Sequence, residues 1–118
     1  MTIDVKVQIK VTDETIDDIM VTALEGGICY WCHRAEVVGE YLGTYASEQI
    51  SRGGKLRLWT ADGEKLILSK SNFLKGLEKY VASHPRIVCN GSIDAAQIDA
   101  GAADVIVQYA VFGKLVYG

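Results

Sequence analysis

The segment at residues 55–68 places the strongest constraint on what this chain can fold into. Two runs of strand-forming residues, 55–59 and 65–68, flank the sequence Ala61-Asp62-Gly63-Glu64. An Asp-Gly pair between such runs favours a tight β-hairpin, because glycine accepts the positive φ that the turn requires. The sequence therefore predicts two antiparallel strands joined by a short turn.

The N-terminal part of the chain predicts a strand followed by a helix. Apolar and polar residues alternate over residues 3–11, which is the period of a half-buried strand. Thr12 offers a hydroxyl N-cap, and Asp13 and Glu14 place negative charge in the first helical turn. The apolar face of this helix consists of Ile16, Ile19, Met20, Ala23 and Leu24. We expect Gly26-Gly27 to end the helix, with one glycine in the left-handed cap conformation.

The middle of the chain predicts a second helix directly after the hairpin. Ser69 caps this helix and Pro85 marks its end. Its apolar stripe consists of Phe73, Leu74, Leu77, Tyr80 and Val81. Before the hairpin, residues 36–45 fit either an irregular strand or a packed loop, and residues 46–54 predict a loop.

The C-terminal part predicts a turn, a third helix and a short strand. Asn90-Gly91 indicates the turn. Either Asp94 or Asp99 caps a helix over about residues 102–112, which Gly113 ends. Residues 115–117 could add a short edge strand.

The composition fits a single α+β domain over residues 1–118. The chain is 49% hydrophobic and 23% charged, close to the globular average, so disorder is not expected. The order of the predicted elements favours an antiparallel sheet with two to three helices packed on one face. A net charge of −3 argues against a protein that binds nucleic-acid backbones. The chain shows no apolar run of membrane-spanning length, no signal peptide and only three cysteines, which together predict the cytoplasm.

Residues 25–34 concentrate chemically versatile side chains directly after the first predicted helix. The spacing Cys29-x-x-Cys32-His33 matches a haem-attachment pattern, but the export signal that this reading needs is missing. A thioredoxin-type pair would follow a strand, whereas this pair follows a helix. A zinc site would draw on Cys29, Cys32 or His33, His84 and Cys89. We favour small buried apolar roles for Cys29 and Cys32, and we expect no metal and no cofactor.

The polar and aromatic residues of the chain favour a ligand site over an active site. Tyr30 and Trp31 can stack on a base, and Arg52-Gly53-Gly54 can hold a phosphate through its guanidinium and backbone amides. Neither a nucleophile elbow nor a Walker A loop is present. The predicted ligand-binding residues are Tyr30, Trp31, Arg34, Arg52, Gly53, Gly54 and Gln108.

Three stretches of the chain resemble small accessory proteins of tailed bacteriophages and prophages. They are residues 23–27 (ALEGG) with Tyr30-Trp31, residues 46–54 (ASEQISRGG) and residues 103–113 (ADVIVQYAVFG). The likeness covers nearly the whole length and carries no catalytic motif. It implies a phage origin, and small acidic phage proteins without a catalytic signature often act against host defence.

The resulting hypothesis is a non-catalytic phage protein that sequesters a small nucleotide-derived immune signal in the host cytoplasm. We expect it to act as a homo-oligomer, without a membrane or nucleic-acid partner. Paired aromatic residues with nearby arginines fit a nucleotide-type ligand. Two alternatives remain: an inhibitor that contacts a host defence complex directly, as anti-CRISPR proteins do, and a zinc-stabilised structural module. A net charge of −3 is weak for nucleic-acid mimicry.

Overall fold

A computed structural model describes residues 1–4 and 6–118 of the chain. The helices are α1 (Asp13–Thr22), α2 (Lys70–Ser83) and α3 (Ala100–Phe112). The strands are β1 (Cys32–Val38), β2 (Lys55–Thr60), β3 (Lys65–Ser69), β4 (Val88–Cys89) and β5 (Ser92–Ile93). Short turns of π or 3-10 helix lie at Ala23–Gly27, Ala46–Glu48, Pro85–Ile87 and Ala95–Gln97. Every helix of the described residues is too short or too polar to span a bilayer.

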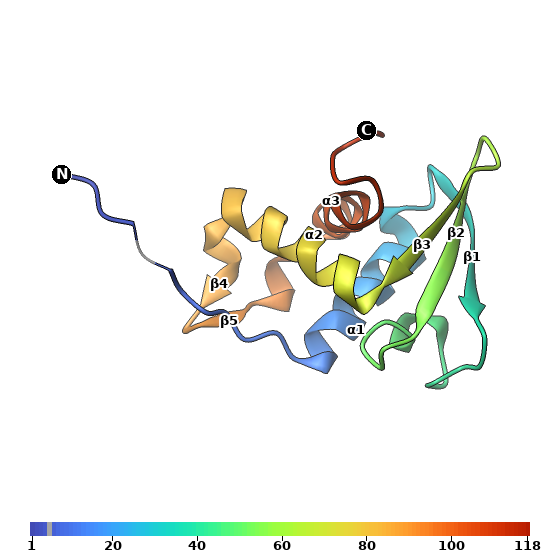
Figure 1. Ribbon diagram of the computed structural model, residues 1–118, viewed down its shortest axis with the longest axis horizontal. Helices are drawn as coiled ribbons and strands as arrows, with labels where there is room; N and C mark the ends of the chain where they lie inside the picture. Colours follow the sequence, from blue (N-terminus) through green and yellow to red (C-terminus); the bar gives the residue numbers. More distant parts are fainter. Residues whose placement is uncertain (5) are drawn as a thin grey trace.

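The main sheet has three antiparallel strands in the order β1-β2-β3, and the three helices lie on one of its faces (Figure 1). Leu56, Leu58 and Leu68 belong to the face that meets the helices, and all three are fully buried. Burial of each such side chain contributes about 2 kcal/mol. A separate hairpin of β4 and β5 follows α2 (Figure 1). The predicted α+β class, with an antiparallel sheet covered on one face by helices, is confirmed.

The predicted hairpin is confirmed as β2 and β3. Trp59 pairs with Lys65 next to the connecting turn, where Gly63 has a φ of +81°. That φ is the conformation for which the Asp-Gly signal selects. The ambiguous segment before the hairpin divides in two: β1 continues to Val38, and the chain leaves the sheet at Gly39, whose φ is +80°.

The predicted helix caps are confirmed for all three helices. The Thr12 and Ser69 hydroxyls each accept a hydrogen bond from the amide three residues further on. Of the two candidates for the third cap, Asp99 begins α3, whereas Asp94 caps the short turn Ala95–Gln97. Gly113 ends α3 in the left-handed conformation, with a φ of +75°. These positions depend on local hydrogen bonds and local dihedral angles, which the sequence specifies directly.

The end of α1 differs from the prediction. The helix continues into a π-helical turn, Ala23–Gly27, and neither Gly26 nor Gly27 takes a positive φ. A Cβ at Gly27 would lie 2.7 Å from the carbonyl oxygen of Ala100, at the start of α3. Close approach of two helical segments, rather than a left-handed cap, therefore requires the second glycine.

The strand predicted over residues 3–11 is wrong for the residues that the structure describes; Val5 lies outside them. The segment is extended, but it belongs to neither sheet. Lys10 alone makes a bridge, parallel to Ser92, and its amide donates to the carbonyl of Gly91 at 2.7 Å. Strand β5 has only two residues, so it offers too few backbone groups for a longer ladder.

The edge strand predicted over residues 115–117 is also wrong. The chain after Gly113 folds back over the core, and the amides of Val116 and Tyr117 both donate to Oε1 of Gln108 at 2.9 Å. A side chain therefore satisfies the backbone groups that a neighbouring strand would otherwise bind.

Candidate functional site

Three of the predicted ligand-binding residues meet around one carboxylate, that of Asp104 on α3. Asp104 is only 8% exposed. Its carboxylate accepts hydrogen bonds from the Tyr30 hydroxyl at 2.6 Å and from Trp31 Nε1 at 2.7 Å. It also accepts one from Gln108 Nε2 at 2.9 Å. These are the short distances of charge-assisted hydrogen bonds. We call these four residues the Asp104 cluster.

The surroundings of Trp31 correct the prediction that it stacks on a base. Its side chain is 1% exposed. Tyr117 stacks on the ring at 5.4 Å between centroids, and Phe112 packs against it at 5.5 Å. Gln108 is fully buried, and its amide holds the C-terminal chain. Trp31 and Gln108 are therefore core residues, and Tyr30, although half-exposed, has its hydroxyl engaged by Asp104.

Tyr30 is expected to make the stability of the protein sensitive to alkaline pH. Partial desolvation of the half-exposed phenol, together with its hydrogen bond to Asp104, raises the pKa of Tyr30 to about 12. The unfolded chain loses this proton near pH 10, whereas the folded chain keeps it. The contribution of Tyr30 to the free energy of unfolding is therefore complete below about pH 10 and is lost as the pH rises towards 12.

Urea unfolding of the wild type and of Tyr30→Phe over a pH series checks this expectation. The stability difference between the two proteins should be constant below about pH 10 and should shrink above it. Tyr41→Phe is the control for the loss of an exposed phenol hydroxyl outside the Asp104 cluster. A stability difference for Tyr30→Phe that stays constant above about pH 10 would contradict the raised pKa.

The predicted phosphate loop is occupied by hydrogen bonds within the protein. The amides of Gly53 and Gly54 each donate to a carbonyl of the same loop, at 3.0 and 2.9 Å. Arg52 forms an ion pair with Glu48 at 3.5 Å. A phosphate held by these amides would have to displace bonds that define the loop. The amides of Gly53 and Gly54 are therefore not free to bind an anion, as the predicted site at residues 52–54 requires.

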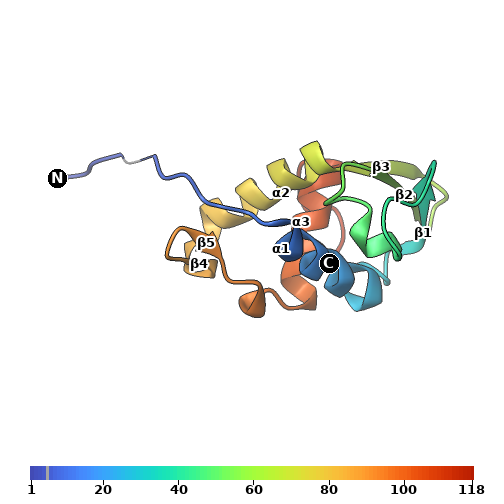
Figure 2. The ribbon, with the colours of Figure 1, turned by 90° about the horizontal axis from the view of Figure 1, so that it is seen from below.

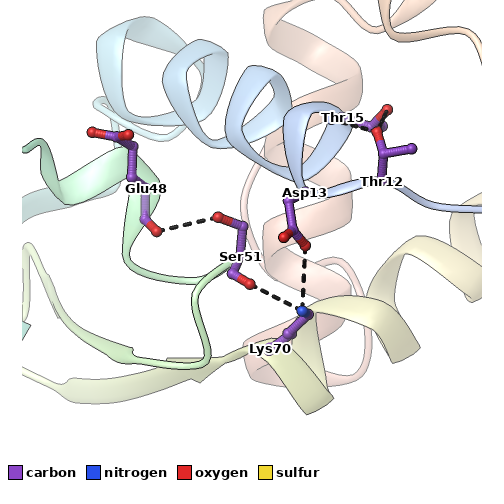
Figure 3. Close-up of polar contacts among 6 residues, drawn as sticks. All are labelled: Thr12, Asp13, Thr15, Glu48, Ser51 and Lys70. Atoms are coloured by element: carbon purple, nitrogen blue, oxygen red, sulfur yellow. Dashed lines mark hydrogen bonds and ion pairs between the residues drawn. The ribbon is translucent and has the colours of Figure 1, made fainter. Parts of the chain in front are cut away.

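Side chains around this loop connect it to two helices (Figure 3). Lys70, at the start of α2, donates to the carbonyl of Ser51 at 2.9 Å and lies 3.5 Å from the carboxylate of Asp13, at the start of α1. The loop also packs tightly inside, because a Cβ at Gly54 would collide with the buried amide of Gln49. Residues 46–54 thus form a packed connection between elements.

Arg34 lies elsewhere, on the face of the main sheet that no helix of the described residues covers (Figure 1). Arg34 is opposite Trp59 on β2, and Trp59 is opposite Lys65 on β3, so the three residues form a row across the sheet. Nζ of Lys65 lies 4.5 Å from the centroid of the Trp59 ring, and the guanidinium carbon of Arg34 lies 5.6 Å from it. Both distances are within the range of cation–π contacts.

A second row lies beside the first. Glu36 on β1 is opposite Arg57 on β2, which is opposite Ile67 on β3. Arg57 donates to the Glu36 carboxylate at 2.9 Å, and this hydrogen bond is the main reason why the pKa of Glu36 is lowered. Arg34 donates to the same carboxylate at 2.8 Å, and Trp59 Nε1 donates to it at 3.3 Å. An ionised Glu36 therefore orients both arginines and the indole ring.

These rows form a cationic surface on an acidic protein. We use the name outer sheet face for the set Arg34, Glu36, Lys55, Arg57, Trp59, Lys65 and Ile67. Its four cations and one carboxylate give a net charge of +3, whereas the whole chain carries −3, so all other residues together carry −6. The turn between β2 and β3 adds Asp62 and Glu64 at one end of the face. The face itself is therefore cationic on a chain of negative net charge, which favours contact with an anion.

The cysteines and histidines do not assemble a metal site in the part of the chain that the structure describes. No group of three His, Cys, Asp or Glu side chains there could hold a metal ion. Cys32 is buried, as predicted, and burial raises the pKa of its thiol. Cys29 is exposed, so the buried role predicted for Cys29 is wrong. His84 stacks on Tyr80 at 4.1 Å between ring centroids. The zinc-module alternative therefore has no ligand set in this structure.

The sequence contained a signal for the outer sheet face. Residues 55–60 alternate so that Leu56 and Leu58 share one face, and Trp59 falls on the other with Lys55 and Arg57. A tryptophan among cations on the solvated side of an amphipathic strand is unusual enough to indicate a contact surface. The partners on β1 were not assignable, because no strand was predicted over residues 25–34 and residues 36–45 fitted either an irregular strand or a packed loop.

A function has to be inferred from the site itself, because no family model, no curated protein and no solved structure matches the chain. The Asp104 cluster and the loop at residues 46–54 use their polar groups to hold the fold together. The outer sheet face instead presents cations and an indole ring on the side of the sheet away from the helices.

Proposed function

We propose that the protein is a non-catalytic binding protein that captures a small nucleotide-type anion on its outer sheet face. The observation that carries this proposal is the row of Arg34, Trp59 and Lys65, with Arg57 beside it, on a chain of negative net charge. Guanidinium and ammonium groups bind phosphate, and an aromatic ring packs against a base. The face therefore combines the two contacts that a nucleotide-derived ligand requires.

Glu36 prepares the two arginines for such a ligand. It accepts one hydrogen bond from each, at 2.8 and 2.9 Å. A guanidinium has five N–H donors, so donors of Arg34 and Arg57 remain for a phosphate even while Glu36 holds both side chains. The Arg34 side chain is 65% exposed, so a ligand reaches it without rearrangement of the core. The exposed side chain of Ile67 offers apolar surface beside them.

The biological role that we propose is sequestration of a nucleotide-derived immune signal in the cytoplasm of an infected host cell. The resemblance to small phage accessory proteins supports this role. The chemistry of the face supports it too, because cations, an indole and an ion-paired carboxylate bind a ligand but supply no activated nucleophile for its turnover.

Isothermal titration calorimetry against cyclic ADP-ribose isomers and cyclic di- and trinucleotides tests the proposal. We expect saturable heat with at least one compound, and affinities weakened by about tenfold or more in Trp59→Ala and in Arg57→Ala. Arg52→Ala is the matched control, because it removes an arginine from the loop at residues 52–54 and leaves the outer sheet face intact. It should bind as the wild type does.

Three results would contradict the proposal. The first is no heat with any compound from protein that circular dichroism shows to be folded. The second is loss of binding in Arg52→Ala but not in Arg57→Ala, which would place the binding site in the loop at residues 52–54. The third is binding of a single-stranded oligonucleotide in preference to every small nucleotide.

A second candidate function is direct contact of the same face with a host defence protein. An open sheet surface that carries a tryptophan and two arginines has the composition of an interface hot spot, whereas small-molecule sites are mostly concave. This candidate predicts that a bacterial protein co-purifies with the wild type and not with Trp59→Ala. It also predicts no calorimetric response to nucleotides.

A further inference from the structure

The first residues of the chain form an arm that projects from the folded body (Figures 1 and 2). We use the name N-terminal arm for residues 1–4 and 6–9. Ile3 is 77% exposed and Val7 is 67% exposed, although both are large apolar residues. Exposed apolar side chains grouped on one segment indicate a contact surface.

The arm has the sequence of a strand but little of the pairing of one. Its apolar residues, Ile3, Val7 and Ile9, alternate with polar residues, as on a strand with one buried face. In the described part of the chain, its continuation at Lys10 makes the single bridge to β5. A lone extended segment is not stable in water, because its backbone groups need partners in a sheet.

The apolar side of the arm also faces incompletely filled space. Val7, Ile9 and Val11 line a groove of about 330 Å³ together with Leu74, Leu77 and Val81 of α2. Ile9 and Val11 are half-buried there, whereas Val7, at the outer end, is mostly exposed. Another apolar segment placed beside Val7 would cover this end of the groove.

Charge complementarity identifies a second copy of the arm as the partner. An antiparallel pairing that sets Asp4 of one copy opposite Lys6 of the other also sets Ile3 opposite Val7. Because the pairing is two-fold symmetric, each of these contacts occurs twice. Apolar residues then share one face, and opposite charges lie across from each other on the other face.

Other registers fit less well. A shift by one residue would set apolar residues opposite polar ones. A shift by two would set Lys6 opposite Lys6 of the second copy and leave Asp4 opposite Gln8. A shift by four would pair Asp4 with Lys10, but Lys10 already lies against β5. We therefore propose that two copies of the chain dimerise through antiparallel pairing of their N-terminal arms. This dimer does not depend on the ligand proposed for the outer sheet face.

Sedimentation velocity of the full chain, at micromolar to submillimolar concentrations, tests the dimer. We expect a reversible dimer for the wild type and a dissociation constant raised by about tenfold or more in Val7→Glu, because the new carboxylates lie on the apolar face. Gln8→Glu is the matched control: it adds the same charge one residue away, on the polar face, and should dimerise as the wild type does.

Charge reversal provides the second arm of the test. Asp4→Lys sets like charges opposite each other and should weaken the dimer, as should Lys6→Asp. The double variant Asp4→Lys/Lys6→Asp restores both ion pairs and should restore the dimer. A wild-type chain that stays monomeric throughout, a dimer indifferent to Val7→Glu, or a double variant weaker than either single variant would overturn the proposal.

Discussion

Asp104→Ala is expected to lower the free energy of unfolding by about 3–5 kcal/mol, because hydrogen bonds to a charged group contribute about 1.5–3 kcal/mol each and are not fully additive. The carboxylate accepts three hydrogen bonds from donors that lie far from it in the sequence or one turn along α3. Alanine would leave the buried indole N–H of Trp31 without an acceptor. It would also remove the nearest of the three acceptors of the buried Gln108 amide, which keeps the Tyr30 hydroxyl and the Tyr117 carbonyl. An unsatisfied buried donor costs about 1–3 kcal/mol by itself.

Urea unfolding of a small series measures this effect. Asp104→Asn should lose clearly less than Asp104→Ala, because an amide oxygen still accepts from Trp31 and the amide nitrogen can donate to the Tyr30 hydroxyl. Asp18→Ala is the control for the loss of one exposed carboxylate and should change stability by less than about 0.5 kcal/mol. Equal losses in the two alanine variants would show that the Asp104 cluster does not stabilise the fold.

Gly76→Ala is expected to destabilise the protein by about 2 kcal/mol, although alanine is the better helix former. Gly76 lies in the middle of α2, where α2 crosses α3. A Cβ there would lie 2.6 Å from the carbonyl oxygen of Ile106 and 2.7 Å from the amide nitrogen of Ala110. Both atoms belong to the backbone of α3, so the helices would have to separate.

Gly101→Ala is the control, and we expect it to change the free energy of unfolding in the opposite direction. Gly101 lies in the first turn of α3, and a Cβ there would meet only the side chain of Asp99 at 3.5 Å, an ordinary contact. The same substitution should therefore stabilise the protein by about 0.5 kcal/mol through helix propensity and the unfolded state. Thermal unfolding that ranks Gly76→Ala at or above the wild type would show that the helix crossing can open without cost.

Local signals in the sequence predicted most of the element boundaries. The hydroxyl of Thr12, the hydroxyl of Ser69 and the left-handed Gly113 act within one helical turn of their own position. The turn at Gly63 is likewise a matter of one residue's dihedral angles. Such features depend on residues that are close in the chain, so the sequence contains everything that determines them.

The candidate site was less predictable, because its residues are distinguished by partners from distant segments. Both tryptophans, Trp31 and Trp59, lie near cationic residues in the sequence. Trp31 is nevertheless buried, because its ring stacks on Tyr117 and its N–H donates to Asp104. Trp59 lies on the outer face, because side chains alternate along β2 and Leu56 and Leu58 pack towards the helices. Asp104 and Gln108, four residues apart on an otherwise apolar helix, were the available hint that α3 holds a buried polar group.

The sequence by itself determined the α+β class, the hairpin of β2 and β3, and the ends of most helices, because periodicity, capping and turn chemistry act over a few residues. Only the tertiary structure decided which aromatic ring is buried, which arginines share a surface, and that the described residues of the N-terminal arm belong to neither sheet of the chain. These outcomes depend on cross-strand register and on contacts between residues more than seventy positions apart, such as Trp31 and Asp104. No local pattern specifies such contacts, because their free energy arises from burial and from hydrogen bonds that exist only after the chain has folded.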